Sequence, residues 1–395
     1  MLRHRLLSLL NTIWAVPTVI IIRSIKPIIL IRIGQLYAGR IGHFVPDVME
    51  HVVRKRISSQ KSLDFYYLFG PTCNQQWKEM ASQELKIKGR WLKYVWHWND
   101  FIPGGYAHNI PQSYTNSRDP LGLFARYRPT LKFTPEEITW CTDWMKEKGW
   151  NPGDPYVCLN VRDAGYMKVY DENKNKFAQE SHNYRNSKIE TYIPAVEWLT
   201  EQGTWVIRMG KLAESQIGMD NQKVIDYAFE KDKSDLLDVW LFANCTGCIS
   251  TASGPDWISV IYGRVTLFVN ALPLGQLFSS SRSFWVPKNL FWTFTGRELN
   301  LSEYISHNLM DSLDYKEMGI KIVDLTPNEI MAAVQEFWGT IMGSWVNSSE
   351  SINQQENFWR KFKEWKEFTK FHGWIHPESS IGSAWLKSKP ADFFE

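Results

Sequence analysis

Along most of this chain, short continuous runs of hydrophobic residues alternate with segments in which hydrophobic residues recur at helical spacing. Short β-branched runs such as 28–33 are typical of strands buried in a parallel sheet, and stretches with apolar residues at helical spacing lie between them. Up to residue 150 the pattern predicts strands over 28–33, 63–70 and 90–98, helices over 45–53, 74–89 and 134–150, and a long loop over 99–130. Thr134 with Glu137 forms a capping-box pattern, and Gly149 follows the last of these helices.

The alternation restarts after "NPGDP" at 151–155. It predicts strands over 156–163, 204–210, 223–228, 265–275 and 319–325, a further strand that runs into "ISTASGP" at 249–255, and helices over 189–203, 234–245, 256–263 and 327–338. Strands that alternate with helices of this length form βαβ units, so we expect an α/β protein with two Rossmann-like parallel-sheet domains facing a cleft. The predicted domains are 27–150 and 151–345, with an N-terminal segment over 1–26 and a Trp-rich helical tail over 346–395 that packs back on the N-terminal domain.

The first 26 residues are apolar in the middle and basic at both ends. Seventeen mostly apolar residues lie between Arg5 and Arg23, and the first acid is Asp47. This pattern favours a helix lying on the surface of an anionic membrane. A spanning helix, for which the segment is short, and a helix packed on the protein's own core are the alternatives.

Composition and charge exclude several classes of protein. A net charge of +3 argues against a dedicated nucleic-acid binder, and 44% hydrophobic residues indicate an ordinary globular chain. The five cysteines are scattered and odd in number, which is typical of a reducing cytosol rather than a disulfide framework. Cys245 and Cys248 form a lone C-x-x-C, for which buried structural thiols are favoured over a redox or metal site.

Cations and hydroxyls gather at the predicted strand ends after residue 155. Arg162 with Asp163, Arg208 with Lys211, and the turn 251–254 follow three different strands, and a further cation, Arg185, lies in the polar loop 182–186. The guanidinium group of arginine can bind two phosphate oxygens at once through parallel hydrogen bonds, and the backbone N–H groups at a helix start can bind an anion. We therefore expect a diphosphate site at which the predicted ligands are Arg162, Arg185, Arg208, Lys211, Thr251, Ser253 and Gly254.

The chain lacks the motifs of other phosphate-binding and metal-binding classes. It has no GxxxxGK[ST], no GxGxxG after a strand, no HExxH and no second CxxC. It also has no Asp-x-Asp, the usual carboxylate pair that holds a divalent ion on a sugar-nucleotide diphosphate. We expect no cofactor and no divalent metal, with cations of the protein neutralising the diphosphate instead.

At these residues the sequence resembles the GT-B glycosyltransferases. "ISTASGPDWISVIYGRVTLFVNALPLG" at 249–275 is similar to the donor loop of bacterial heptosyltransferases, and "VCLNVRD" at 157–163 resembles the His-x-Arg strand end of GT-B fucosyltransferases. Over about 155–345 the chain is most similar to an uncharacterised bacterial glycosyltransferase family of surface-polysaccharide synthesis. The resemblance implies a GT-B fold, a nucleotide-sugar donor, and Arg162 as a diphosphate ligand.

The acceptor base is where the sequence departs from the heptosyltransferases. Those enzymes usually carry an Asp in the first glycine loop, whereas this loop reads "GRIGH" with Arg40 and His43. A histidine can take a proton near neutral pH, so His43 is one candidate base, together with Asp163. Asp47 and His182 are further candidates, and a retaining enzyme needs no such base.

The sequence thus predicts a bacterial hexosyl- or deoxyhexosyltransferase. It would move a sugar from a nucleotide-diphosphate donor to a lipid-linked or polysaccharide acceptor at the cytoplasmic face of the plasma membrane, without a metal and without nucleic acid. The first domain and the 99–130 loop would bind the acceptor. The alternatives are a sugar-nucleotide epimerase or hydrolase of the same shape, and a non-catalytic membrane-bound scaffold.

Overall fold

The computed structural model describes residues 2–128, 131–165 and 180–395, and the chain divides into two compact units. The first comprises residues 1–118 and 129–133, and the second comprises 119–128 and 134–395. The sequence predicted the boundary at 150, but α6 (Pro135–Glu147) belongs to the second unit. There the indole of Trp144 lies edge-on to Tyr227 at 5.8 Å, and Lys148 pairs with Glu230 at 2.6 Å.

The first unit is built on a four-stranded parallel sheet in the order β3-β2-β1-β4. Its strands are β1 (Leu30–Tyr37), β2 (Ser62–Phe69), β3 (Lys86–Lys88) and β4 (Asn109–Ile110). Arg32 on β1 lies opposite Asp64 on β2, and its guanidinium donates to both carboxylate oxygens at 2.7 and 2.6 Å. This bidentate ion pair joins the two longest strands of the sheet.

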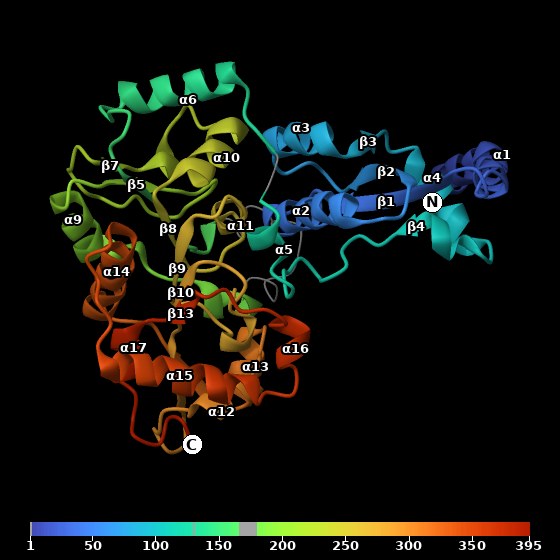
Figure 1. Ribbon diagram of the computed structural model, residues 1–395. Helices are drawn as coiled ribbons and strands as arrows, with labels where there is room; N and C mark the ends of the chain where they lie inside the picture. Colours follow the sequence, from blue (N-terminus) through green and yellow to red (C-terminus); the bar gives the residue numbers. More distant parts are fainter. Residues whose placement is uncertain (1, 129–130, 166–179) are drawn as a thin grey trace. The chain divides into compact units, whose positions relative to one another are not determined.

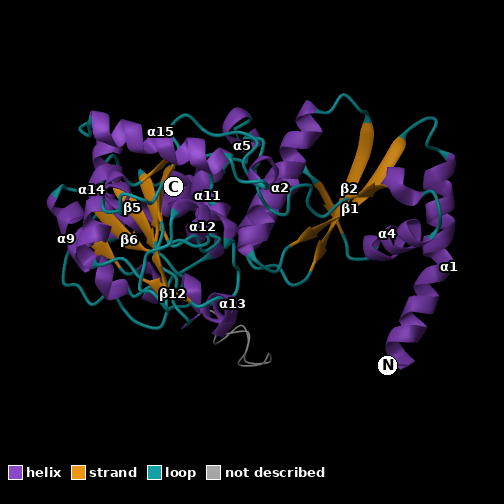
Figure 2. Ribbon diagram, turned by 90° about the horizontal axis from the view of Figure 1, so that it is seen from below, coloured by secondary structure: helices purple, strands orange, loops and turns teal. Residues whose placement is uncertain are grey.

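Helices cover both faces of this sheet (Figure 2). On one face α2 (Ile41–Ile57) packs on β1 and on α3 (Gln75–Glu84), and its His51 ring lies 5.1 Å from the Tyr66 ring. On the other face lies α4 (Leu92–Phe101), whose Leu92 and Val95 are buried against Ile33. The connection to β4 is the 3₁₀ turn η1 (Gly105–His108).

The structure corrects the prediction of a strand over 90–98. Aromatic residues are enriched in strands, and this segment is rich in them. Its buried positions, however, are Leu92, Val95 and Asn99, which lie three and four residues apart and therefore share one face of a helix. Helical spacing, not aromatic content, decided the structure. As a result, the predicted loop over 99–130 also contains the end of α4, η1, β4 and α5 (Leu123–Arg126).

Helix α1 (Leu2–Ser24) packs on the core of the first unit through its second half. Ala15 and Val19 are fully buried beside α4, and the Arg23 guanidinium donates to four oxygens of 99–103, at 2.7–3.0 Å. Large aliphatic side chains remain exposed on the same helix: Ile13 at 72%, Ile20 at 57% and Ile21 at 60%. Within the described residues, no helix combines the length and apolar character needed to cross a bilayer.

The second unit is built on a seven-stranded parallel sheet in the order β13-β10-β9-β8-β5-β6-β7 (Figure 1). Its strands are β5 (Tyr156–Asn160), β6 (Trp205–Arg208), β7 (Val224–Ile225), β8 (Gly247–Ser250), β9 (Val265–Val269), β10 (Ser283–Val286) and β13 (Ser380–Ile381). The five central strands are almost wholly buried; the sequence predicted β5, β6, β8 and β9, whereas it did not predict β10. The chain is therefore an α/β protein with two Rossmann-like parallel sheets.

Helices also cover both faces of the second sheet. On one face α10 (Asp235–Asn244) packs on α6 and on α11 (Asp256–Ile261). On the other face α14 (Pro327–Met342) packs on α9 (Ile193–Glu201) and on β9 (Figure 1). The sequence predicted the starts of α6 and α14 correctly, since both Thr134 and Thr326 form complete capping boxes. The remaining elements here are η2 (Asn183–Arg185), η3 (Ile189–Tyr192), η4 (Tyr227–Phe229), η5 (Leu274–Gln276), α12 (Leu301–Ser306), α13 (Ser312–Glu317) and the antiparallel pair β11 (Asn289–Trp292) and β12 (Ile320–Val323).

The tail is part of the second unit, whereas the sequence predicted packing on the N-terminal domain. Helix α15 (Ser349–Lys363) packs on α12 and α17 (Ser383–Lys387), next to the short α16 (Phe368–Phe371). His372 is buried and bonds the Ser279 hydroxyl at 2.8 Å and the Gly275 carbonyl at 3.1 Å. Strand β13 then pairs with β10 at the edge of the large sheet. The aromatic residues of the tail therefore complete this unit's own core.

Candidate functional site

The switch point of the large sheet lies between β5 and β8. Strand β5 is first in the chain order of this sheet, with β6 on one side and β8 on the other. Connections leaving β5 and β8 therefore diverge, and open parallel sheets bind ligands at such a point, outside the carboxyl ends of the strands. Asn160 ends β5 and Ser250 ends β8, so the segments 161–163 and 251–254 begin at this edge.

Arg162 is anchored to the loop after β8. Its backbone N–H donates to the Thr251 hydroxyl at 3.0 Å, and its side-chain Nε donates to the amide oxygen of Asn186 at 3.2 Å. The Thr251 N–H in turn donates to the Asn160 carbonyl at 3.2 Å. Thr251 is 1% exposed, whereas Arg162 is only partly buried. Thr251 therefore positions Arg162 and is not placed to be a ligand itself.

Arg185 reaches the same loop from the 3₁₀ turn η2. Its guanidinium donates to the Ala252 carbonyl at 2.5 Å. The chain that carries it is fixed to three strand exits: the Ser187 N–H donates to the Arg162 carbonyl at 2.9 Å, the Asn270 amide donates to the Ser187 hydroxyl at 2.9 Å, and the ammonium of Lys288 donates to the Asn186 carbonyl at 2.6 Å. The Arg185 guanidinium is thus held on the loop at the switch point, and the Arg162 guanidinium is held on Asn186, the residue that follows Arg185.

The turn 251–254 is held from within by a buried carboxylate. The Asp256 carboxylate accepts the Ser250 hydroxyl at 2.7 Å and the Ser253 N–H at 2.9 Å, and Gly254 follows in the left-handed region at φ 99°. Asp256 is fully buried, and this burial raises its pKa, opposed by those hydrogen bonds and by Arg185. Ser253 also accepts the Asn160 amide at 2.8 Å.

At the helix start after Gly254, where the sequence predicts a diphosphate contact, the chain supplies an acid of its own. Helix α11 has only six residues, so its macrodipole is small, and Asp256 is its first residue. That side chain takes up the Ser253 N–H that the sequence assigned to a diphosphate. The positive charge beside this loop therefore comes from the two arginines.

Three predicted residues form a second group on the other side of β5. Arg208 is 1% exposed and pairs with Asp226 at 3.2 Å and with Asp163 at 3.7 Å. The Asp163 carboxylate also accepts the N–H groups of Gly165 and Glu214, both at 2.9 Å. Arg208 is enclosed between two carboxylates and Asp163 holds loop backbone, while the binding role of Arg208 and the base role of Asp163 stay predictions. Lys211 is exposed and pairs with Asp235 at 3.4 Å.

His43, the other candidate base, lies at the carboxyl edge of the smaller sheet. It is an exposed residue of the first turn of α2, which follows β1. Its Nδ1 lies 2.7 Å from the Ser117 hydroxyl, and its ring is edge-on to Tyr37 at 5.7 Å. Two further residues could serve as a base by their chemistry. Asp47 is fully buried one turn further along the same helix, and His182 belongs to the second unit beside η2.

Sequence reasoning missed the residues that hold the arginines in place. Asn186, within the 182–188 segment, accepts the Nε–H of Arg162, and Asn270 and Lys288 bind that segment from the exits of β9 and β10. The signal was present in part, because Asn270 directly follows β9, Lys288 lies two residues after β10, and Asn186 follows the predicted cation Arg185. Asn270, at φ 55°, has the backbone conformation that asparagine adopts more readily than most residues.

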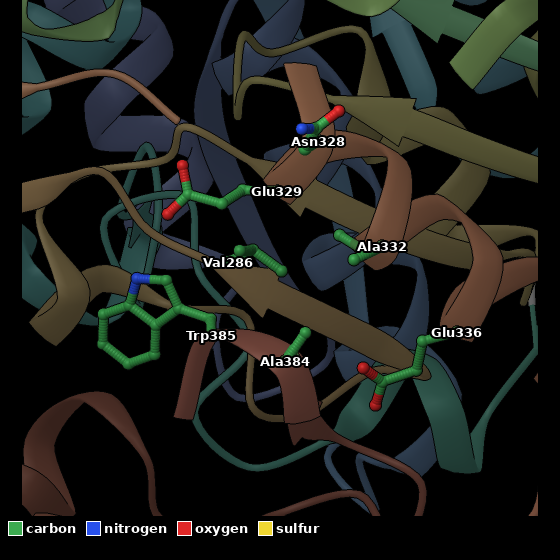
Figure 3. Close-up of a pocket in the computed structure, with 9 residues that line it drawn as sticks. Val286, Asn328, Glu329, Ala332, Glu336, Ala384 and Trp385 are labelled. Carbon is green, nitrogen blue, oxygen red and sulfur yellow. The ribbon is translucent and has the colours of Figure 1, made fainter. Parts of the chain in front are cut away.

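A cavity of about 200 Å³ lies elsewhere on the second unit, between the end of β10 and the starts of α14 and α17 (Figure 3). Its walls are mostly apolar, with Val286, Ala332 and Trp385 among them. One of its carboxylates, Glu336, is buried and accepts the N–H and the hydroxyl of Ser383, both at 2.7 Å. No predicted site residue lines this cavity, so it adds nothing to the site at the switch point.

The described residues contain no group of three metal-ligating side chains. The five cysteines are not joined to one another, and Cys141, Cys158, Cys245 and Cys248 are buried. Burial raises the pKa of the Cys158 and Cys248 thiols. The C-x-x-C pair therefore lies in the core, as the structural interpretation predicted.

Comparisons with solved structures give distant likenesses, among them the following two. The heptosyltransferase II of E. coli, described as an ADP-heptose lipopolysaccharide heptosyltransferase, is 10% identical, with a TM-score of 0.43 over 79% of this chain and 99% of that one. A glycosyl transferase of family 9 from Veillonella parvula is 10% identical, with a TM-score of 0.46 over 80% and 98%. No family description and no curated protein matches the chain. Likenesses this weak carry no argument of their own.

Proposed function

We propose that this protein is a GT-B glycosyltransferase that takes its sugar from a nucleoside-diphosphate donor. The observation that carries the proposal is the pair Arg162 and Arg185, fixed beside the 251–254 loop at the switch point of a parallel sheet. Guanidinium groups bind phosphate oxygens in a planar, bidentate way, and a leaving diphosphate needs its developing charge neutralised. A diphosphate at this edge would meet both groups.

The residues of this site fall into those that would contact the diphosphate and those that would hold them in place. Arg162 and Arg185 would bind the diphosphate, the Ser253 hydroxyl would contribute a polar contact, and Gly254 would let the chain pass close to the ligand without a side chain. Thr251, Asn186 and Asp256 would hold these groups in place. Arg208 and Lys211 are not part of this constellation, because both are paired with carboxylates on the other side of β5.

The two arginines also support metal-independent transfer. Together they carry the charge that a divalent cation would otherwise supply to a diphosphate. Asp256, the carboxylate that interacts with Arg185 in the described part of the chain, is buried and bonded to Ser250 and Ser253. The proposal is tested by adding EDTA, which is expected to leave donor binding and transfer unchanged.

For the acceptor, we propose a lipid-linked or polysaccharide glycan of the bacterial surface, met at the cytoplasmic face of the plasma membrane. Support comes from α1, where Ile13, Ile20 and Ile21 remain exposed on a helix whose opposite face is buried on the first unit. The chain around them is basic, with no acid before Asp47. An exposed aliphatic face with cations is what an interfacial helix presents to anionic lipid.

The decisive experiment measures donor binding and transfer together. A calorimetric panel of GDP-, UDP-, ADP-, CMP- and dTDP-sugars is expected to give one preferred nucleotide. Arg162→Ala and Arg185→Ala should each weaken its binding by about tenfold to a hundredfold, the equivalent of roughly 1.5–3 kcal/mol for a charge-assisted hydrogen bond. Lys146→Ala, which removes a surface lysine paired with Asp143, is the matched control and should change nothing.

Product analysis separates the remaining functions. Transfer that requires an added glycan acceptor supports the proposal. Release of free sugar or formation of an epimer without acceptor would replace it with a sugar-nucleotide hydrolase or epimerase. No affinity for any nucleoside diphosphate would leave a non-catalytic scaffold.

A further inference from the structure

The first unit exposes large apolar side chains on α4 and η1 as well as on α1. Trp91, directly before α4, is 51% exposed, Phe101 at the end of α4 is 71% exposed, and Tyr106 in η1 is 95% exposed. Helices α1 and α4 lie side by side (Figure 2). Exposed apolar side chains gathered in this way mark a surface that meets another molecule or a membrane.

On α1 the exposed residues form one stripe. Ile13, Pro17 and Ile20 are exposed and lie four and three residues apart, so they share one face of the helix. Ala15 and Val19 lie on the opposite face, where both are buried. The helix therefore uses one face for the core of the first unit and leaves an aliphatic face uncovered.

The aromatic residues of α4 form a second stripe. Their spacing of three and four residues places them on one face of the helix, beside the face that is buried on the sheet. Within the stripe the rings of Trp98 and Phe101 are in edge contact, with their centroids 5.6 Å apart. The members of the stripe are Trp91, Tyr94, Trp98 and Phe101.

Contacts at both ends join the two stripes. The Trp14 ring of α1 lies edge-on to the rings of Trp91 at 5.9 Å and Tyr94 at 6.2 Å. At the other end, the Arg23 guanidinium holds the end of α4 through its hydrogen bonds to 99–103. The aliphatic stripe of α1 and the aromatic stripe of α4 therefore belong to one fixed surface.

The turn η1 extends this surface. Gly105 is packed so closely on α4 that a Cβ there would lie 1.8 Å from the Asn99 carbonyl oxygen, and the Asn99 amide donates to the Gly105 carbonyl at 3.0 Å. The next residue, Tyr106, is almost fully exposed on this tightly packed turn. A ring presented by a fixed turn loses little conformational freedom when a partner covers it.

The charge around the surface is positive. Residues 1–29 contain four Lys and Arg and no acid, and residues 90–106 contain two Lys and Arg and one acid, Asp100. Lys26 and Lys93 are exposed, and the Lys93 ammonium lies over the Tyr94 ring at 4.7 Å. A symmetric pair of copies would bring these cations together, because it places the same surface of each copy against the other. Anionic lipid headgroups would neutralise them instead.

We propose that α1, α4 and η1 form a single surface with which the first unit lies on an anionic membrane. This inference rests on the proposed function, which assigns membrane contact to α1, and it adds a second, aromatic anchor. The isoleucines of α1 and Phe101 would enter the acyl boundary, with Trp91 and Tyr106 at the level of the headgroups, where Trp and Tyr are enriched in membrane proteins.

The test measures flotation of the full-length protein with vesicles of phosphatidylethanolamine and phosphatidylglycerol. Phe101→Ser should lower the partition coefficient about tenfold, which is the factor for moving one large apolar side chain out of water. Tyr106→Ser should lower it in the same direction. Ile57→Ser is the matched control, because it removes an exposed apolar side chain from α2, on the other face of the same sheet, and should change nothing. Thermal unfolding checks that each variant is folded.

Hydrogen–deuterium exchange of the wild type locates the contact independently of any variant. Anionic vesicles should slow exchange in peptides over 91–106 as well as 13–24, and phosphatidylcholine vesicles should do so less. Slower exchange in α1 alone, or wild-type flotation of both Phe101→Ser and Tyr106→Ser, would overturn the inference. Slower exchange that grows with protein concentration in the absence of lipid would also overturn it, because a second copy would then cover the surface.

The proposed transferase function is judged separately, by transfer to a water-soluble glycan acceptor without vesicles. Transfer in that assay by a protein that does not bind the vesicles would overturn the membrane inference alone. Vesicle binding through 91–106 without transfer to any acceptor would support the membrane surface and contradict the transferase function.

Discussion

The carboxylate of Asp256 accepts the backbone N–H of Ser253 at 2.9 Å, so an anion belonging to the chain already occupies a donor of the 251–254 loop. The loop has the sequence of an anion-binding turn, yet its conformation is maintained from within. The cations beside it are those of Arg162 and Arg185. The loop is therefore a fixed support next to which two guanidinium groups are placed, and this difference leads to the first prediction.

Asp256→Ala should destabilise the second unit. It leaves the Ser250 hydroxyl and the Ser253 N–H without their buried partner, and each such loss costs about 1–3 kcal/mol. Asp256→Asn keeps one acceptor oxygen and should lose less stability. Urea unfolding followed by tryptophan fluorescence measures both. Equal stability of wild type and Asp256→Ala would show that the carboxylate does not hold the loop.

Arg208→Met and Lys211→Met should change the unfolding free energy by different amounts and leave nucleotide binding intact. The sequence predicted a binding role for both residues. Arg208 is buried between Asp226 and Asp163, so its loss should cost on the order of 3 kcal/mol of unfolding free energy. Lys211 is exposed, and its pair with Asp235 contributes less than about 1 kcal/mol. Neither change should weaken nucleotide binding in the protein that remains folded. Thermal unfolding with and without nucleotide checks both points, and a large affinity loss in Lys211→Met would return this lysine to the donor site.

The stability of the first unit should fall as the pH rises from about 4 to about 7. The pKa of Asp47 is raised from 3.8 to about 7 by burial, so the folded protein binds one more proton than the unfolded chain within this range. Each pKa unit corresponds to about 1.4 kcal/mol, which makes the decrease a few kcal/mol. Asp47→Asn should remove this dependence of the unfolding free energy on pH. Compared with the wild type at the same pH, the variant should therefore be more stable at pH 8 than at pH 4. A parallel pH profile for both proteins in urea unfolding would contradict the assignment.

Substitutions at two neighbouring residues of α1, Val19 and Ile20, should distinguish the helix's packing on the first unit from its contact with a membrane. Val19 is 1% exposed and packs beside α4, so Val19→Asn should destabilise the first unit, whereas Ile20, at 57% exposure, tolerates the same change. Ile20→Asn should instead reduce binding to vesicles that contain anionic lipid. Flotation of both variants, with neutral vesicles as the reference, measures the contact. Unchanged flotation of a double variant at Ile20 and Ile21 would remove the support for an interfacial helix.

Much of the fold was predictable because strand burial and helix capping are local signals. The parallel sheets follow from β-branched runs such as 265–269, and α6 and α14 begin at Thr134 and Thr326, where their capping boxes start them. The prediction of a strand over 90–98 was wrong because aromatic side chains occur in strands and in helices. Only the spacing of Leu92, Val95 and Asn99 distinguishes a helix from a strand here. The predicted domain boundary at 150 differs from the observed one because "NPGDP" is a turn inside the second unit.

The site was predicted less well than the fold because charge alone does not say which side chain is enclosed. Arg162, Arg185 and Arg208 look equivalent as strand-end or loop cations in the sequence. The structure separates them through partners distant in the chain: Asp226 encloses Arg208, and Asn186 and Ala252 position the other two. The role of Asp256 was hidden for the opposite reason, since an acid in the first turn of a helix is usually exposed.

The division of the chain at residue 118 also determines how hybrid enzymes could be made from it. Asp119 caps α5 by accepting the N–H groups of Leu123 and Phe124, and the Phe124 ring is edge-on to Trp257, at 5.9 Å, in the large-sheet unit. A crossover placed near 150 would separate α5 and α6 from those partners. A crossover after Arg118 keeps them together, so a first unit exchanged at that point would be joined to a second unit whose α5 and α6 contacts are intact.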